Sequence, residues 1–512
     1  MAAEGLHARF RALWGEIRDL ESAQQLLEWD QETYMPAGGA AARGRVLATL
    51  AGLRHARLTA PELSETVATL AEAAPDGEWE AQAREASRLV RRATAVPRRL
   101  AEEIAAASSA GLAAWQEARP RRDYALLAPA LARLLSLKRE EAGCLASDGT
   151  KGGRLYDALL DQYEPGATEA ELSPLFALLR SRLVPLVRAV GESGRTVDEA
   201  AARGAYPRDA QRELGAWVAA QIGFDFTAGR LDLAAHPFCM GIDRRDVRLT
   251  WRADEADFRP GLMGILHEMG HGLYDQGLPE TWQGTPLGEA ASVGVHESQS
   301  RLWEVLVGRG PAFWRWLRPR FRQAFPGQGP ADSELWRVLH AIRPSLIRVE
   351  ADEATYNLHV LVRFELERAL FDGSLQVADL PQAWDDAYEA VLGLRPAHDG
   401  EGVLQDLHWA AGYFGYFPTY TLGTLAAVQL YRAADRALGG LEEAIAAGDF
   451  GGLLGWLRAN VHGHGSRFRP AELLARAAGA PLSAEPFLAY VEGVASATYG
   501  VAAGPSAGAM GS

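Results

Sequence analysis

Apolar residues recur along most of the chain at the three- and four-residue spacing of an amphipathic helix. The N-terminal stretch shows this clearly, because one helical face would carry Leu6, Phe10, Leu13, Trp14 and Ile17, with charged residues between them. The same spacing continues to about Leu145, interrupted by turn residues near 36–39, 75–77 and Pro97. The pattern predicts an almost entirely helical protein.

The spacing changes between Leu231 and Asp254. Apolar and polar residues alternate from Val247 to Arg252, which predicts a short β-strand. Asp246, Arg248 and Thr250 would lie on one face of this strand. Such a strand is a candidate for aligning an extended peptide, or for presenting Arg248 to an anionic group.

An apolar helical run follows the strand and contains His267-Glu268-Met269-Gly270-His271, an HExxH sequence. Positions four apart lie one turn apart on the same face of a helix, so the two imidazoles can bind one Zn²⁺. Glu268 projects beside the metal, where a general base must lie to take a proton from a metal-activated water. The helix is supported by an apolar stripe, and Gly277 is expected to end it; the stripe consists of Leu262, Ile265, Leu266, Met269 and Leu273.

A catalytic zinc needs a third protein ligand and an open position for water. Position 277 is glycine, so the pattern with a third histidine six residues after His271 is absent. A carboxylate from a later helix is the alternative, and Glu297 is the best candidate because it begins a helical run through Leu302 and Val305. Glu289 is the nearest rival, although it follows a glycine in a stretch that resembles a loop.

Two later segments concentrate functional groups. A long helix is predicted from Ile347 to Leu370, and Arg348, Asp352, Thr355 and His359 would form one polar stripe along it. The second segment runs from Gly402 to Trp409, where Asp406 could orient a metal-binding imidazole. Phenols follow at 416 and 420, and a phenol or an imidazole can stabilise an oxyanion.

Composition narrows the class of protein. The chain has 512 residues, of which 48% are hydrophobic, enough to form a large core or two lobes. A net charge of -14 without a basic stripe argues against nucleic acid as a partner. With only Cys144 and Cys239, neither a disulfide framework nor a thiolate metal cluster is expected.

The same patterns predict the location of the protein and the character of its chain ends. The amphipathic start does not resemble a signal peptide, and no run approaches the length of a membrane span, so a cytoplasmic location is expected. Residues 1–500 are predicted to form a single helical domain. Residues 501–512 are small and are predicted to be disordered.

Taken together, these clusters resemble the Taq-type family of zinc-dependent carboxypeptidases, and the resemblance spans most of the chain. The segments around 29–39 and 156–166 also look like that family. The short signatures around HExxH appear in the family's order: His236-Pro237-Phe238, Asp246-x-Arg248-x-Thr250, His267-Glu268-x-x-His271, His296-Glu297-Ser298-Gln299, Ile347-Arg348-x-x-Ala351-Asp352 and Gly402-x-x-Gln405-Asp406-x-His408-Trp409.

The resemblance implies a predominantly all-α, two-lobed fold with a deep central active-site cleft and a small β region beside the HExxH helix. It also implies a homodimer that removes single C-terminal residues from peptides with a free C-terminal carboxylate. The preference would be broad, with Pro disfavoured. Zn²⁺ is the expected cofactor, and Co²⁺ or Mn²⁺ could occupy the same ligands.

The resemblance also implies roles for single residues. His267, His271 and Glu297 would bind the metal, and Glu268 would activate water. Arg248 and Arg348 are both candidates for gripping the terminal carboxylate, since a guanidinium can bind a carboxylate bidentately. Tyr420 and His236 are candidates for the oxyanion donor. The remaining signature residues are expected to contact substrate (Gln405, His408) or to support the metal ligands (His296, Asp352, Asp406).

Two other functions are compatible with parts of this pattern. A zinc oligopeptidase that cuts internal bonds would also have HExxH, a distant glutamate and a helical fold. A helical peptide-binding scaffold would instead hold a structural zinc with four protein ligands. The two arginines favour the carboxypeptidase, because a buried cation offsets the desolvation of a terminal carboxylate.

Overall fold

The computed structural model describes residues 2–73, 77–146 and 154–501. It is 70% helical and 4% strand, which confirms the predominantly helical fold class. The break predicted at Pro97 is present, since one helix ends at Ala95 and the next begins at Arg98. The break at 75–76 and the predicted tail after Val501 lie outside the described residues. No helix among the described residues is long and apolar enough to cross a membrane.

The chain divides into two compact units. Unit 1 comprises Met1–Thr94, Glu199–Trp336 and Ala426–Leu482, and unit 2 comprises Ala95–Asp198, Arg337–Leu425 and Ser483–Ser512. Each unit therefore combines segments that are far apart in the sequence. A single domain over residues 1–500 stays a prediction.

Unit 1 holds the N-terminal helices, a small sheet and the HExxH helix. Its elements are α1 (Ala2–Thr33), α2 (Ala40–Leu58), α3 (Pro61–Ala73), α4 (Gly77–Ala95), α9 (Arg208–Ile222), β1 (Gly229–Leu233), β2 (Cys239–Asp243), β3 (Asp246–Trp251), α10 (Phe258–Gly277), α11 (Val293–Arg301), a π-helical segment (Leu302–Val307), α12 (Pro311–Ala324), α17 (Glu442–Ala446), α18 (Gly451–Asn460) and α19 (Pro470–Ala478).

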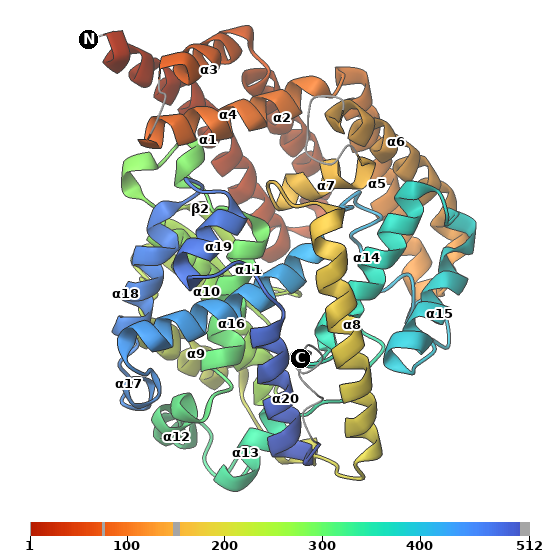
Figure 1. The fold of residues 1–512 in the computed structure, drawn as a ribbon, viewed down its shortest axis with the longest axis vertical. Helices are drawn as coiled ribbons and strands as arrows, with labels where there is room; N and C mark the ends of the chain where they lie inside the picture. The colour runs from red at the N-terminus through yellow and green to blue at the C-terminus, as the bar shows by residue number, and fades with distance from the viewer. Residues whose placement is uncertain (1, 74–76, 147–153, 502–512) are drawn as a thin grey trace, which may run out of the picture. The chain divides into compact units, whose positions relative to one another are not determined.

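Unit 2 is built from helices and the long connection before residue 418. Its helices are α5 (Arg98–Arg121), α6 (Ala128–Ala146), α7 (Leu155–Tyr163), α8 (Glu169–Glu192), α14 (Tyr356–Asp372), α15 (Leu380–Leu392) and α20 (Glu485–Tyr499). Figure 1 shows α20 beside the long helix α8, and the two are in contact. Two further helices, α13 (Asp332–Leu339) and α16 (Pro418–Leu438), run from one unit into the other.

The predicted strand is β3, and it is the central strand of a three-stranded sheet with the order β1-β3-β2. It pairs with β1 in parallel and with β2 antiparallel. Helix α10 packs against β3 and β2, so the expected β region beside the HExxH helix is confirmed. Because both edges of β3 are paired, it has no free edge along which an extended peptide could align.

Helix α10 forms as its apolar pattern predicts. All five residues of the stripe Leu262, Ile265, Leu266, Met269 and Leu273 are buried, and burying each contributes about 1.5–3 kcal/mol. The side chain of Asp257 accepts a hydrogen bond from the backbone N–H of Arg259 and caps the first turn. The helix ends at Gly277, as expected.

The long helix predicted from Ile347 to Leu370 is wrong in its first part. Helix α14 begins only at Tyr356, and residues 348–350 form a short 3-10 turn. The side chain of Asp352 accepts hydrogen bonds from the backbone N–H groups of Ala354 and Thr355. Such local bonds compete with helical ones, so Arg348 and His359 do not share a continuous helical stripe.

Candidate active site

His267, His271 and Glu297 come together in unit 1 as a group that can hold a metal ion. Their ligand atoms all lie within 4.8 Å of one another. Glu297 Oε2 is 3.7 Å from His267 Nε2 and 3.5 Å from His271 Nε2. Ligands that share one tetrahedral Zn²⁺ at its usual bond lengths are about 3.3–3.5 Å apart. Two imidazoles and one carboxylate, with no thiolate, therefore match the three protein ligands of a catalytic zinc site.

A close approach of two helices places Glu297 beside the histidines. Gly270 lies between His267 and His271 on α10, and a Cβ atom there would come within 2.6 Å of Gln299 O and of Ser300 Cα. Both are backbone atoms of α11, so any larger residue would push α11 away. The glycine within the HExxH sequence thus allows the third ligand to reach the pair of histidines.

The charges around this group favour a cation. Although burial opposes it, the carboxylates of Glu297 and Glu304 raise the pKa of His267 to about 9. Burial alone would also raise the pKa of Glu297, but His267 and His271 lower it to about 2. Burial raises the pKa of Glu268 to about 7. Glu297 is thus kept as an anion, and Glu268 can exchange a proton near neutral pH.

Glu304 is a functional candidate that the sequence-based reasoning did not identify. Its Oε2 lies 3.0 Å from His267 Nδ1, on the ring side opposite to the atom that faces Glu297. Arg301 and Arg309 donate hydrogen bonds of 3.0 and 2.8 Å to the same carboxylate. Glu304 belongs to the π-helical segment 302–307. The sequence feature that could have identified Glu304 is its position as a lone carboxylate in the apolar run Leu302–Val307, seven residues after Glu297.

A carboxylate behind a metal-binding histidine sets its tautomer and orientation. We therefore expect Glu304→Gln to weaken metal binding by about 10–100-fold, because the amide can still accept from His267 but carries no charge. Competition with a chromogenic chelator measures this affinity on the folded protein. Glu365→Gln, at a partly exposed ion pair in unit 2, is the control. Unchanged metal affinity in Glu304→Gln would mean that Glu304 serves only as a partner of Arg301 and Arg309 and does not support His267.

The rival ligand Glu289 is engaged elsewhere in unit 1. Its carboxylate forms an ion pair of 3.0 Å with Arg18 of α1. His296 stacks on His271 with 4.4 Å between ring centroids, and its Nε2 lies 2.9 Å from Asp275 Oδ1. His296 thus contacts His271 directly, and its role in supporting the metal ligands stays a prediction.

The two strand-region candidates differ in their surroundings. His236 lies exposed in the loop between β1 and β2. Arg248 donates two hydrogen bonds of 2.9 Å to Asp246, and its guanidinium lies 4.3 Å from the ring centroid of Trp29. The charge of Arg248 is therefore balanced by one carboxylate, and its face is covered by an aromatic ring.

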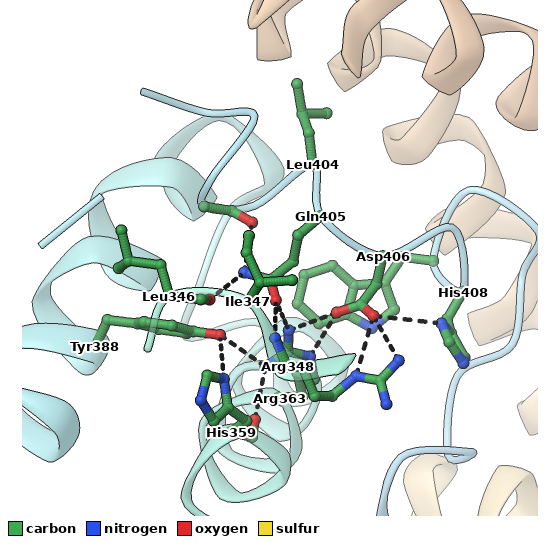
Figure 2. Close-up of polar contacts among 12 residues, drawn as sticks. Leu346, Ile347, Arg348, His359, Arg363, Tyr388, Leu404, Gln405, Asp406 and His408 are labelled. Carbon is green, nitrogen blue, oxygen red and sulfur yellow. Dashed lines mark hydrogen bonds and ion pairs between the residues drawn. The ribbon is translucent and has the colours of Figure 1, made fainter. Parts of the chain in front are cut away.

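Arg348 belongs to a buried cluster in unit 2 that Figure 2 shows. It donates to Asp406 Oδ1 through Nε at 3.1 Å and through Nη2 at 2.8 Å. Arg363 of α14 donates to Asp406 Oδ2 through Nε at 2.7 Å. Gln405 accepts from the backbone N–H of Arg348 and from Arg363 Nη2. Two guanidinium groups thus share one carboxylate.

The cluster has an excess positive charge. Although burial alone would raise it, Arg348 and Arg363 hold the pKa of Asp406 well below its usual range. Burial lowers the pKa of His408 to about 3 and that of His359 well below its ordinary value, so both are neutral. Arg348 is only 6% exposed and shares its carboxylate partner with Arg363, so an anionic ligand would stabilise its buried charge.

The hydrogen-bond donors distinguish the two arginines. Arg363 Nη1 donates to His359 O and to Tyr388, and its Nε and Nη2 are taken by Asp406 and Gln405. All five of its N–H groups are accounted for. Arg348 uses Nε, one N–H of Nη2 and one of Nη1, the last toward Tyr356. Arg348 retains donors on both terminal nitrogens, the pair that binds a carboxylate bidentately.

His408 and Tyr420 lie beside this cluster. His408 Nε2 is 3.2 Å from the hydroxyl of Tyr420, and the Arg348 guanidinium is 4.9 Å from the Tyr420 ring centroid. Asp406 is occupied by the two arginines and lies 3.9 Å from His408 Nδ1. Asp352 caps the loop before α14, as described above. The roles expected for Asp406 and Asp352 in supporting the metal ligands stay predictions.

Comparison with known proteins identifies the family of this chain. The sequence profile of the carboxypeptidase Taq (M32) metallopeptidase family matches residues 9–494. Thermostable carboxypeptidase 1 of Thermus thermophilus is 46% identical over 98% of this chain and 100% of its own. Carboxypeptidase 1 of Bacillus subtilis is 35% identical over 94% of this chain and 96% of its own.

Solved structures show the same relationship. The crystal structure of an M32 carboxypeptidase from Deinococcus radiodurans superimposes with a TM-score of 0.93 at 40% identity, over 97% of this chain and 100% of that one. The resemblance in the short signatures is therefore a family relationship over the whole length. The chain belongs to the Taq-type (M32) family of metallocarboxypeptidases, enzymes that depend on a metal ion and act on peptides.

Proposed function

We propose that this enzyme is a zinc carboxypeptidase that removes single residues from the free C-termini of peptides, with broad preference and with Pro disfavoured. The observation that carries the proposal is the group of His267, His271 and Glu297, whose ligand atoms lie within 4.8 Å of one another on α10 and α11. Zn²⁺ is proposed because two imidazoles, one carboxylate and an open position are typical of catalytic zinc; Co²⁺ or Mn²⁺ could replace it.

Glu268 is the proposed general base. A bound Zn²⁺ would supply Lewis-acid chemistry by acidifying a water and polarising the scissile carbonyl. Glu268 takes the proton from that water and later delivers it to the amine of the departing residue. Burial favours the protonated form of Glu268, which supports a carboxylate that accepts a proton and then releases it.

Arg348 is the proposed partner of the terminal carboxylate. Its support is the excess positive charge of the Arg348, Arg363 and Asp406 cluster and the donors left on Nη1 and Nη2. Gln405 accepts hydrogen bonds from both arginines, and His408 lies beside the cluster; both complete the proposed substrate-binding group. Arg248 is a weaker candidate, since Asp246 balances its charge.

Arg348→Lys is expected to raise KM for free-carboxylate peptides by about 10–100-fold, the loss of one or two charge-assisted hydrogen bonds. Lysine keeps the charge but cannot bind bidentately. Steady-state kinetics of Arg348→Lys and Arg248→Lys with one short peptide make the comparison. A larger KM increase in Arg248→Lys would reverse the assignment.

Tyr420 is the proposed donor to the developing oxyanion. Its hydroxyl lies 3.2 Å from the neutral His408, and a phenol held in this way can donate a hydrogen bond without carrying charge. The alternative donor is His236, which is exposed. A cytoplasmic location and a homodimer belong to the same proposal; cell fractionation and light scattering of the purified enzyme test them.

The decisive experiment uses one unblocked peptide and its C-terminally amidated twin. We expect the metal-loaded enzyme to shorten the free peptide stepwise from its C-terminus and to leave the amidated twin intact, and a chelator to stop the shortening of the free peptide. Mass spectrometry of the products follows each step. Internal fragments from both peptides would instead indicate a zinc oligopeptidase, and no metal-dependent cleavage would contradict the proposal.

A further inference from the structure

Glu367 is a fully buried carboxylate in unit 2 that takes no part in the proposed chemistry. Three groups donate to it: the indole N–H of Trp409 to Oε1 at 2.7 Å, and the hydroxyl of Tyr156 and the backbone N–H of Gly415 to Oε2 at 2.7 and 2.9 Å. Two of the donors belong to the segment 402–417. This segment, which we call the Gln405 segment, contains Gln405, Asp406 and His408.

The Gln405 segment has no helix or strand of its own, so other elements must hold it in place. Helix α14 does this along one face, because Arg363 and Glu367 are one turn apart. Arg363 binds Gln405 and Asp406, and Glu367 binds the segment further along its length.

Helix α7 also contacts the Gln405 segment, at Gly415. Gly415 has a φ of +84°, and a Cβ atom there would lie 2.9 Å from the backbone carbon of Leu159 in α7. The segment therefore meets α7 backbone to backbone at the residue whose N–H binds Glu367. Tyr156, also in α7, binds the same carboxylate oxygen. Glu367 thus ties α7, α14 and the Gln405 segment together.

Only a carboxylate satisfies this arrangement. The N–H groups of Trp409 and Gly415 point at different oxygens of Glu367, and neither can accept a hydrogen bond. A glutamine in place of Glu367 would turn its NH₂ group toward one of these two donors in either orientation. Burial raises the pKa of Glu367 to about 7, and the three donated hydrogen bonds oppose that shift.

We propose that Glu367 is a positioning residue for substrate binding: through Trp409 and Gly415 it holds the Gln405 segment, so that Asp406 and Gln405 orient Arg348 toward a substrate carboxylate. The proposal rests on the function proposed above for Arg348. It gives roles to Tyr156 and Trp409, two signature-region residues that the proposed chemistry does not use.

The test compares Glu367→Gln with three other variants by kinetics and by hydrogen–deuterium exchange. Glu367→Gln is expected to raise KM about tenfold, with kcat changed less, since one buried hydrogen bond to a charged group is worth about that factor. Backbone amides in 405–417 should exchange faster. Trp409→Phe removes one of the two donors in the segment and should act in the same direction.

Two variants separate positioning from general destabilisation. Tyr156→Phe removes the hydroxyl that donates to Oε2 of Glu367 but leaves both hydrogen bonds from the Gln405 segment to Glu367. We therefore expect a lower melting temperature with KM unchanged. Glu365 is near Glu367 on α14 and is partly exposed, so Glu365→Gln should change neither the melting temperature nor KM. Metal content should equal that of the wild type in all four variants.

The values of KM and the exchange rates in these variants decide between positioning and general destabilisation. Faster exchange in 405–417 together with a raised KM in Glu367→Gln and Trp409→Phe, but not in Tyr156→Phe, supports the proposal. Wild-type KM and exchange in a folded Glu367→Gln would overturn it, as would equal KM effects in Tyr156→Phe. If Glu367→Gln does not fold, Trp409→Phe decides by the same criteria. An inactive wild type would contradict the function proposed for the enzyme, while the exchange rates would still decide whether Glu367 holds the segment.

Discussion

Glu268→Gln is expected to lose activity by about 10²–10⁴-fold, the usual contribution of a general acid–base group, while keeping its metal. The amide has nearly the shape of the carboxylate but cannot take a proton from water. Glu268 is also distinct from the three residues proposed to bind the metal. The loss should therefore lie in kcat, measured with one C-terminally unblocked peptide, and not in metal content.

Metal analysis of the purified variant is the control for this prediction. A full complement of metal with low kcat assigns the proton transfer to Glu268. Turnover close to that of the wild type would mean that another group accepts the proton. Loss of metal together with activity would mean that the substitution disturbs the ligands, and Glu268→Asp would then be compared, since it keeps the acid but shortens its reach.

Glu297→Ala is expected to abolish activity through loss of the metal. Removing a ligand should weaken metal binding more than the roughly 10–100-fold expected for a residue behind a ligand. Alanine also leaves Ser300 without the carboxylate that lies 3.2 Å from its hydroxyl. Metal content after dialysis, followed by chelator competition, measures the effect.

Glu289→Ala is the matched control, because both residues are glutamates of unit 1 and only one faces the histidines. Glu289 pairs with Arg18, so its removal should leave metal affinity unchanged. Full metal content in Glu297→Ala together with loss in Glu289→Ala would exchange the two assignments. Activity restored to Glu297→Ala by excess metal would still agree with a ligand role.

Several features of the site were predictable because they depend on local periodicity. The spacing of His267 and His271 on an apolar helix indicates a metal pair, since residues four apart share a helical face. The alternation before this helix predicted β3, and the structure confirms both elements. The choice of Glu297 over Glu289 also followed from helical spacing, and the grouping of ligand atoms agrees with it.

Other features could not be predicted in this way, because helical spacing does not show which side-chain contacts form, either locally or between distant segments. Helix α14 begins only at Tyr356 because the side chain of Asp352 accepts hydrogen bonds from nearby backbone N–H groups. This local competition with helical hydrogen bonds is not visible in the spacing of apolar residues. Glu304 appeared only as one acid in an apolar run until the π-helical segment placed it behind His267.

The sequence by itself determined the helical class, the family, the histidine pair proposed to bind the metal and the proposed base, because each depends on residues within one or two turns or on short signatures. Only the tertiary structure decided which charges are balanced. Arg248 and Arg348 look alike in sequence, but Arg248 has its own carboxylate and Arg348 shares one with Arg363. Burial makes such an imbalance costly, and burial and charge pairing are properties of the folded chain.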